Sequence, residues 1–445
     1  MEPDAAGPTS LAPPLAEASR GPVAGTGAEV ADQPAIRPAV TLWLLSAAHA
    51  VNHAQAVVLP LIYLQVTMAF GVGVDTIAFL SAAGAFVAGV VPLTFAALSR
   101  RVSRRRLLGV GGLLFGGGFV AQALATSFPV FAAANVISRV GGSPQHPVGN
   151  GLLAEQYPPE RRGFAISAHI TGGNVGTIVV AVVGAPVIAA FGWQGAAVLF
   201  GLPAIVAAVA ILLLVRESGA DRRAAVAHGS VLAAYRAVVR DRDLRWLYLT
   251  SILGGGGRGL GVVNLFALLY LTQVVGVGEQ LSGVMYGALI VFSVPMPLVA
   301  GWLSDRLGRK PLIVGVYLGG AVAFAVFLLA GSSVAGLWLG IVLMGLFSFA
   351  ESPQLQALLA DLAPPSIRDA SFAAYYTLAF GVGSLWVAAY GAIIGVAGER
   401  AGLPLVFALM AVAFLLAALG TLPIRDEGRQ RGASGEAQVR SSGPR

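Results

Sequence analysis

Several side chains that could do chemistry lie inside long apolar runs of this 445-residue sequence. Two are arginines, Arg139 and Arg258, and one is a carboxylic acid, Glu351. A full charge in such a run needs a partner, water or a solute, because apolar surroundings do not solvate it. We predict that Glu351 pairs with one arginine, while the other offers a bidentate site to a carboxylate or a phosphonate.

Histidines and amides accompany these charges on two helix faces. His49, Asn52 and His53 are spaced i, i+3 and i+4, so they share one face. A second stripe recurs at steps of four, three and four: Arg139, Ser143, His146 and Asn150. Pro144 and Pro147 flank His146, so the helix should kink there and free backbone carbonyls. The alternative role of each histidine or amide, including His169 and Asn174, is a hydrogen bond that only joins helices.

Neither an enzyme site nor a metal site is predicted. No nucleophile, base and orienting group occur at a recognisable spacing, and the glycine run 254–257 is followed by Arg258 rather than by Lys-Ser or Lys-Thr. His49 and His53 are a bare pair without a nearby carboxylate, and the chain has no cysteine. We therefore expect no catalytic residue, no metal and no cofactor.

The composition indicates a membrane protein. Hydrophobic residues make up 56% of the chain and charged residues 11%, whereas a typical soluble domain has about 25% charged residues. The net charge of +7 is carried by short loops and tails, which argues against nucleic acid as a partner. A span needs about 20 apolar residues, so about twelve helices fill this length. The predicted fold class is an all-α integral membrane protein, with the lipid bilayer as its partner.

These spans group into two sets of six. The first set is expected near 40–67, 76–98, 106–125, 128–153, 164–190 and 194–215. The second set is expected near 244–274, 280–303, 311–330, 334–360, 370–396 and 402–423. We therefore predict an N-terminal bundle over 39–215, a central loop over 216–243 and a C-terminal bundle over 244–423. Segments 1–38 and 424–445 are predicted to be disordered tails, and no signal peptide is indicated.

Charges in the loops predict the orientation. Arginines crowd the loop between the second and third spans, and two more follow the fourth span: Arg100, Arg101, Arg104, Arg105, Arg106, Arg161 and Arg162. The alternate loops hold few charges, among them Asp75 and Glu279. The positive-inside rule therefore places both termini and the central loop in the cytoplasm.

The two halves of the sequence repeat each other. A shift of 205 residues pairs Pro92-Leu93 with Pro297-Leu298 and Leu98-Ser99 with Leu303-Ser304. It also pairs Arg104 with Arg309, and His53 with Arg258, so the last two are expected to face one central cavity. A six-helix unit duplicated in parallel is the architecture that this repeat predicts.

A charged loop in the second half carries a resemblance to a known family. The stretch Gly301-Trp302-Leu303-Ser304-Asp305-Arg306-Leu307-Gly308-Arg309-Lys310 matches G-x-L-x-D-R-x-G-R-K, which resembles the loop signature of the major facilitator superfamily. We expect Gly301 to permit close helix contact and Asp305 to cap a neighbouring helix. The gating loop is assigned to Gly301, Asp305, Arg306, Gly308 and Arg309. The first-half copy is degraded, because Arg100 replaces the aspartate.

Further residues resemble one branch of that superfamily. Ser143-Pro144-Gln145-His146-Pro147 and Gly172-Gly173-Asn174-Val175-Gly176 look like the fosmidomycin-resistance type of exporter. Two features depart from drug–proton antiporters: Asn135 stands where those often have an arginine, and Thr177 follows Gly176 where a proline would complete their motif.

The resemblance implies a monomeric transporter in a bacterial inner membrane that works by alternating access. We expect it to move a small organic anion, by proton-linked efflux or alternatively by proton symport as uptake. A non-transporting receptor on the same fold is the alternative of a different class. Solute contacts are assigned to Arg258, Arg139, His53, His146, Asn52 and Gln354. Coupling protons are assigned to Glu351, His53 and His146, because unperturbed histidine titrates near about pH 6.5.

Overall fold

The computed structural model describes residues 35–425, and every regular element within them is a helix. The predicted tails, 1–38 and 424–445, lie almost wholly outside these residues. Nine helical stretches of the described chain are long and apolar enough to cross a membrane. The predicted all-helical, membrane-spanning fold class is confirmed.

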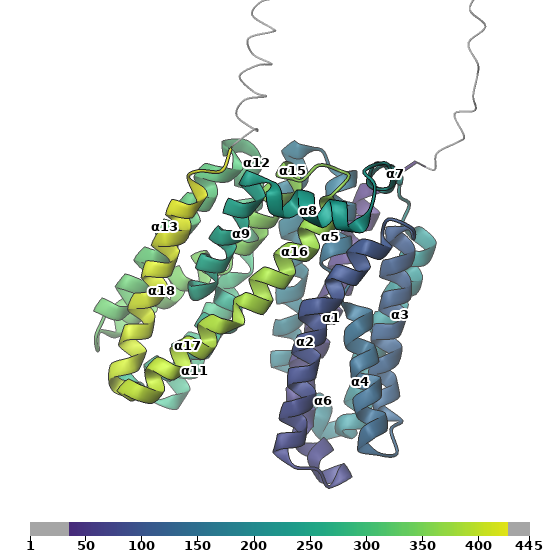
Figure 1. Cartoon of the computed structure of the whole chain (residues 1–445). Coiled ribbons are helices and arrows are strands. Elements are labelled where there is room, and N and C mark those ends of the chain that lie inside the picture. Colours follow the sequence, from purple (N-terminus) through teal and green to yellow (C-terminus); the bar gives the residue numbers. More distant parts are fainter. Residues whose placement is uncertain (1–34, 426–445) are drawn as a thin grey trace, which may run out of the picture. The chain divides into compact units, whose positions relative to one another are not determined.

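The first half contains six labelled helices (Figure 1). They are α1 (Pro38–Phe70), α2 (Val74–Leu98), α3 (Arg104–Ala123), α4 (Phe128–Gly142), α5 (Pro147–Gln156) and α6 (Pro159–Leu214). At about 1.5 Å per residue, the 56 residues of α6 would extend about 84 Å, whereas the hydrocarbon core of a bilayer is about 30 Å thick. Gly192 breaks this helix with a φ of 67°, which glycine tolerates. The α6 stretch therefore makes two spans, as the sequence predicts.

The fourth span is broken at the two prolines. Because α4 ends at Gly142 and α5 begins at Pro147, residues 143–146 form a turn that includes His146. The second half has a matching break, since α14 (Val334–Phe347) and α15 (Glu351–Leu362) are separated by residues 348–350. The second break starts 205 residues after the first (348 against 143), which is the shift that aligns the halves in sequence.

Residues 216–243, predicted as a loop, are largely helical. They contain α7 (Ala220–Ala227) and α8 (Val231–Arg240), and the Ser230 hydroxyl caps α8 by accepting a hydrogen bond from Ala233 N. The Tyr235 hydroxyl on α8 donates to the Leu93 carbonyl on α2 over 2.9 Å. Burial, assisted by the negative charge of Asp369, raises the pKa of Tyr235 to about 12. This segment is therefore packed onto α2.

The second half begins with a broken span. The helix α9 (Arg242–Gly254) continues into a short 3₁₀ helix, η1 (Gly255–Gly257). The backbone of Arg258, which follows it, is extended, with φ −63° and ψ 132°. The remaining elements are η2 (Gly259–Val263), α10 (Asn264–Leu269), η3 (Tyr270–Val275), α11 (Glu279–Ser293), α12 (Pro295–Leu307), α13 (Arg309–Leu329), α16 (Arg368–Tyr376), η4 (Thr377–Val382), α17 (Ser384–Ala397) and α18 (Glu399–Thr421). The glycines allow close packing at the break: a Cβ on Gly257 would lie 2.6 Å from the Phe414 ring.

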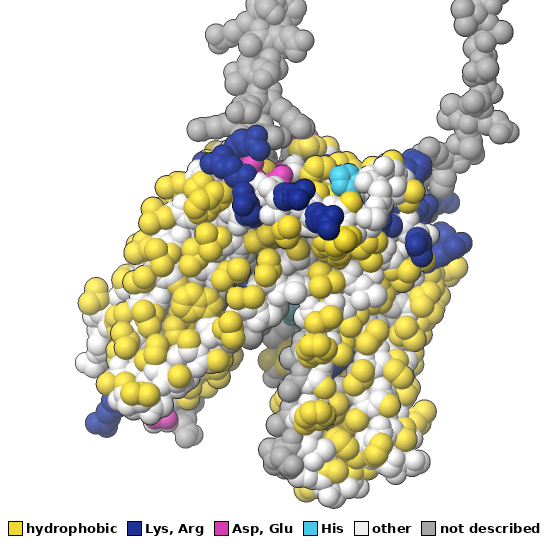
Figure 2. All heavy atoms as spheres, viewed as in Figure 1, with side chains coloured by type: hydrophobic (Ala, Val, Ile, Leu, Met, Phe, Trp, Pro, Cys, Tyr) yellow, Lys and Arg dark blue, Asp and Glu magenta, His cyan; other side chains and the backbone are white. Residues whose placement is uncertain are grey.

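Buried apolar side chains form separate clusters in the two halves. Phe119, Phe131 and Trp193 belong to a first-half cluster, whereas Tyr270, Phe324 and Phe414 belong to a larger second-half cluster. Basic side chains gather at one end of the described chain, around α8 and α12 in this view (Figure 2). We call this end, where the loops after α2, α5 and α12 lie, the basic end.

Candidate functional site

A cavity of about 670 Å³ lies between the two halves. Its walls come from α1, α2, α3 and α4 of the first half, and from the end of α16 with η4 of the second. The apolar part of the lining includes Leu59, Phe86, Phe115 and Phe119. The polar part consists of Asn52, Gln55, Asn135, Ser138, Arg139, Ser143, His146, Tyr376 and Thr377. A mostly apolar cavity of this size with a few polar groups fits a small organic molecule.

Arg139 is the one charged side chain among the described lining residues. Its Nε donates to Asn135 Oδ1 over 3.0 Å, and its backbone carbonyl accepts from the Ser143 hydroxyl over 2.9 Å. Within residues 35–425, no described carboxylate forms an ion pair with Arg139, and no described atom accepts from its Nη1 or Nη2. The guanidinium lies against Gly84, where a Cβ would be 2.2 Å from Nε. Arg139 therefore presents donors without a matching anion.

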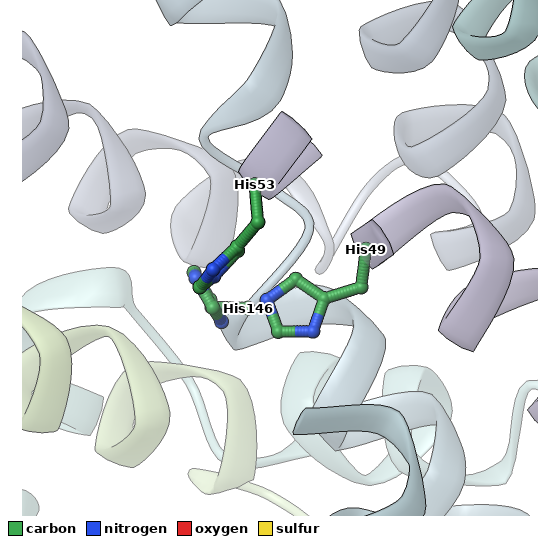
Figure 3. A group of neighbouring side chains, drawn as sticks. All are labelled: His49, His53 and His146. Atoms are coloured by element: carbon green, nitrogen blue, oxygen red, sulfur yellow. The ribbon is translucent and has the colours of Figure 1, made fainter. Parts of the chain in front are cut away.

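Four histidines lie together beside this cavity. The His49 ring centroid is 4.6 Å from those of His53 and His146, and it stacks on His169 at 4.5 Å. One ring nitrogen each of His49, His53 and His146 lies within 4.8 Å of the other two (Figure 3). His49 and His169 are fully buried, whereas His53 and His146 are half-buried. The sequence predicts the His49–His53 pair, but it does not show that His146 from the α4–α5 turn and His169 from α6 join it.

Polar contacts close the cavity where α5 meets α15 and α16. The His146 ring stacks on Tyr376 with centroids 4.5 Å apart. Asn150 Nδ2 donates to Gln356 Oε1 over 2.5 Å and to the Tyr376 hydroxyl oxygen over 3.0 Å. The Tyr376 hydroxyl also donates to Gln356 Oε1. Asn150 thus joins the two halves, which fits the alternative role considered for it.

Arg258 and Glu351 form a buried ion pair away from the cavity lining. Arg258 Nε donates to Glu351 Oε1 over 2.5 Å, and the Tyr317 hydroxyl donates to Glu351 Oε2 over 3.0 Å. The other guanidinium nitrogens of Arg258 donate to the carbonyls of Ala379 and Ser251. The predicted pairing of Glu351 with one arginine is therefore present, and the arginine is Arg258.

The charged loop between α12 and α13 contacts the first half. Asp305 Oδ1 and Oδ2 each accept a hydrogen bond over 2.9 Å, from the backbone N–H groups of Gly163 and Phe164 in the first turns of α6. A Cβ on Gly301 would lie 2.6 Å from the Gly163 carbonyl oxygen, so this contact requires glycine. The expected close helix contact at Gly301 is present. Asp305 binds α6 at its fifth and sixth residues, so it does not form the expected cap at the helix N-terminus.

The remaining loop residues have different partners. Arg309 pairs with Asp305, donates to Asp361 Oδ2 over 2.9 Å and donates to the Pro159 carbonyl over 2.6 Å. Gly308, with a φ of 96°, separates α12 from α13. The Arg306 guanidinium stacks 3.5 Å above the Trp302 ring.

Arg104, the first-half counterpart of Arg309, anchors a second contact at the basic end. Arg104 Nη2 lies 2.7 Å from Asp369 on α16 and 3.1 Å from Asp221 on α7, and Arg104 Nη1 lies 2.5 Å from Glu155. Asp221 also pairs with Arg368 over 2.5 Å. These acidic partners could not be predicted from the sequence, because carboxylates near span ends resemble ordinary loop charges.

The predicted solute contacts fall in separate places. Asn52, Arg139 and His146 line the cavity. His53 does not line it but belongs to the histidine cluster beside it. Arg258 and Gln354 do not line it: Gln354 is fully buried and donates to the Ser167 hydroxyl over 3.1 Å. The expectation that His53 and Arg258 face one cavity is wrong, because Arg258 turns toward Glu351. Tyr376 lines the cavity and was missed, since a tyrosine in an apolar run carries no charge signal.

Two helical halves that enclose a cavity with a few polar groups and meet through charged loops define a membrane carrier. A family model described as Major Facilitator Superfamily matches residues 44–388. The chain belongs to this superfamily, and it is a multi-pass membrane transporter of small solutes rather than an enzyme.

Named relatives and a solved structure agree with this assignment. A Bacillus subtilis protein named for niacin/nicotinamide transport is 26% identical over 365 residues, which cover 78% of this chain and 84% of that protein. The fosmidomycin resistance protein of Escherichia coli is 26% identical over 316 residues, covering 68% and 72%. The fucose:proton symporter FucP of E. coli superposes with a TM-score of 0.71 at 15% identity, covering 87% of this chain and 98% of that one.

Proposed function

We propose that this protein transports a small organic anion that binds to Arg139. The observation that carries the proposal is a guanidinium in a cavity of about 670 Å³ with no anion paired to it in the described chain. A planar guanidinium binds a carboxylate or a phosphonate through two parallel hydrogen bonds. Phe86, Phe115 and Phe119 supply apolar contact for the rest of the solute.

The names of two relatives support the same chemistry. Niacin is a carboxylic acid and fosmidomycin is a phosphonic acid, and both are small. Nicotinamide has nearly the shape of nicotinate but no charge, so the two form a matched pair of probes. If Arg139 recognises an anion, nicotinate and other small carboxylates should bind more tightly than their amides.

The experiment measures binding of nicotinate, nicotinamide, benzoate, benzamide and fosmidomycin to the purified protein. We expect an anion to bind, and Arg139→Gln to lower its affinity at least about tenfold. Arg139→Lys should also weaken it, because an ammonium lacks the planar fork. Arg258→Gln serves as the comparison, since its partner is Glu351. Equal affinity for acids and amides, or unchanged anion affinity in Arg139→Gln, would contradict the proposal.

We further propose that transport is coupled to protons and that Glu351 carries the coupling proton. Glu351 faces Arg258, Tyr317 and Tyr375, all buried with it. In the arrangement described here Glu351 is paired with Arg258, so a coupling role requires the pair to part in another state of the cycle. Flux into proteoliposomes under imposed pH gradients distinguishes efflux by antiport from uptake by symport. Proton carriage by His53 and His146 stays a prediction.

We also propose an orientation in the membrane and an oligomeric state. On the positive-inside rule, we propose that the basic end faces the cytoplasm of a bacterium and that both termini are cytoplasmic. The protein is proposed to act as a monomer in the inner membrane. Reporter fusions in the loop that contains Lys310 should report the cytoplasm, whereas fusions in the loop after Gly71 should report the outside.

A further inference from the structure

The four-histidine cluster has a feature that helix joining alone does not explain. The His49 Nδ1 atom lies 2.7 Å from the backbone carbonyl of His169, and a carbonyl only accepts, so Nδ1 carries the proton. The lone pair of His49 is therefore on Nε2. This nitrogen is fully buried and has no hydrogen-bond partner in the described chain. A buried acceptor without a partner is costly unless something binds it.

The nitrogens that surround His49 Nε2 are those of other imidazoles. One ring nitrogen each of His49, His53 and His146 lies within 4.8 Å of the other two, and Figure 3 shows the His53 and His146 rings together on one side of the His49 ring. His53 Nδ1 lies 3.5 Å from the Thr177 hydroxyl, which itself donates to the Gly173 carbonyl over 3.3 Å. In His49 and His53, one ring nitrogen therefore faces an oxygen atom, and the other ring nitrogen is available to a ligand.

We propose that His49, His53 and His146 bind one divalent transition-metal ion of the zinc class. Neutral imidazole is a preferred ligand of Zn²⁺, and metal-binding histidines usually donate their second N–H to a carbonyl or another oxygen, as His49 does. At a Zn–N distance of about 2.0–2.1 Å, tetrahedral ligand nitrogens lie about 3.4 Å apart. Because the three nitrogens lie within 4.8 Å of one another, their separations have to shorten by at most about 1.4 Å to reach that geometry.

The cavity gives this site an entrance and an open position. His146 and Asn52 line the cavity, so an ion can reach the cluster from it. Three histidines leave the fourth position of a tetrahedral ion to water or to an anion. Because neutral imidazoles do not cancel the charge of the ion, an anion in that position would lower the cost of holding it in the membrane. A coupling proton is the competing occupant, since it binds the same lone pairs.

The test is a titration of the purified full-length protein, without a polyhistidine tag, with ZnCl₂ and separately with CoCl₂. We expect one ion per chain, with the visible absorption of four-coordinate Co²⁺. His49→Gln, His53→Gln and His146→Gln should each weaken binding at least about tenfold. The chain has five histidines and no cysteine, so His228→Gln, at an exposed position, is the matched control and should bind normally.

Two results would overturn the proposal. One is binding that survives in His49→Gln or is lost in His228→Gln, which would place the ion elsewhere. The other is the absence of four-coordinate Co²⁺ bands in the unmodified protein, which would leave the lone pairs to protons. The second result needs no variant, so it decides the question even if a substitution prevents folding. Neither outcome depends on which solute is transported.

Discussion

Asn135 is the residue that presents Arg139 to the cavity. Its Oδ1 accepts the Nε–H of Arg139, while its Nδ2 donates to Gln122 Oε1 over 3.2 Å. Gln122 in turn donates to the Gly118 carbonyl over 3.3 Å. This chain of amides runs from α3 to the guanidinium and satisfies Nε without adding a charge. It leaves the positive charge of Arg139 for a solute.

Replacing Asn135 by aspartate tests this arrangement. Asn135→Asp puts a carboxylate against Nε, so the guanidinium gains a permanent anion that competes with the solute. We expect the affinity for a small carboxylate to fall at least about tenfold, measured by isothermal titration. Asn135→Ala removes only one hydrogen bond and should cost less. If Asn135→Asp binds the carboxylate as well as the parent does, Arg139 is not the anion site.

The charged residues of these sites could be predicted from the sequence, but their partners could not. Arg139, Arg258 and Glu351 are conspicuous because charge inside an apolar run is rare. Which arginine pairs with Glu351 depends on the break at Gly254–Gly257, which turns Arg258 toward α15. Likewise, the His146 ring of the histidine cluster comes from the turn 143–146, about one hundred positions after His49 and His53 in the sequence.

At the scale of elements, the α12–α13 loop is fastened to the start of α6. Asp305 accepts hydrogen bonds from the backbone N–H groups of Gly163 and Phe164, the fifth and sixth residues of α6. The positive end of the helix dipole also favours a carboxylate there. The equivalent first-half position is Arg100, which cannot make this contact. The two loops therefore differ in how firmly they join the halves.

Neutralising this carboxylate should weaken the loop contact. Asp305→Asn removes the charge that stabilises the start of α6 and the pair with Arg309, so we expect slower transport with normal membrane insertion. The loss of stability should be about 1–2 kcal/mol in thermal unfolding. Arg100→Gln is the matched change in the other loop and should alter flux less. Full flux in Asp305→Asn would show that this loop contributes to membrane topology but not to transport.

The spans could be predicted from long apolar runs, whereas breaks within them could be predicted only where proline or glycine marks them. Pro144 and Pro147 predict the α4–α5 turn, but the break between α14 and α15 has no proline within residues 348–350. The helices α7 and α8 could not be predicted as spans, because charged residues interrupt 216–243 and no apolar run there is long enough to cross a membrane. Their packing depends on tertiary contacts such as Tyr235 with Leu93.

At the scale of the whole molecule, the halves are joined on the basic-end side of the cavity. Asp369 with Arg104, Asp361 with Arg162, and Asp305 with Gly163 all connect helices of different halves. Alternating access requires such contacts to part while the other end closes. Glu351 lies outside these contacts, yet the Arg258 that holds it also donates to Ala379 in η4, next to the cavity-lining Thr377. The Glu351–Arg258 pair is thus connected to the cavity wall through η4.

If Glu351 carries the coupling proton, removing its carboxyl group should uncouple transport from the pH gradient. In Glu351→Gln the side chain can no longer gain or lose a proton, so accumulation driven by a pH gradient should be abolished. Solute exchange without a gradient should continue, because it needs no net proton movement. Tyr317→Phe removes a hydrogen bond but keeps the carboxylate, and it should retain the gradient response.

Stability must be controlled in this experiment. Glu351→Gln leaves the Arg258 charge buried without its anion, which costs about 3–5 kcal/mol. The double variant Arg258→Gln with Glu351→Gln removes both charges and should recover part of that loss, so it reports on folding separately from coupling. The decisive readout is the ratio of gradient-driven uptake to exchange in proteoliposomes. If Glu351→Gln keeps the parental ratio, the proton is carried elsewhere, and the Glu351–Arg258 pair serves only to hold the broken span against α15.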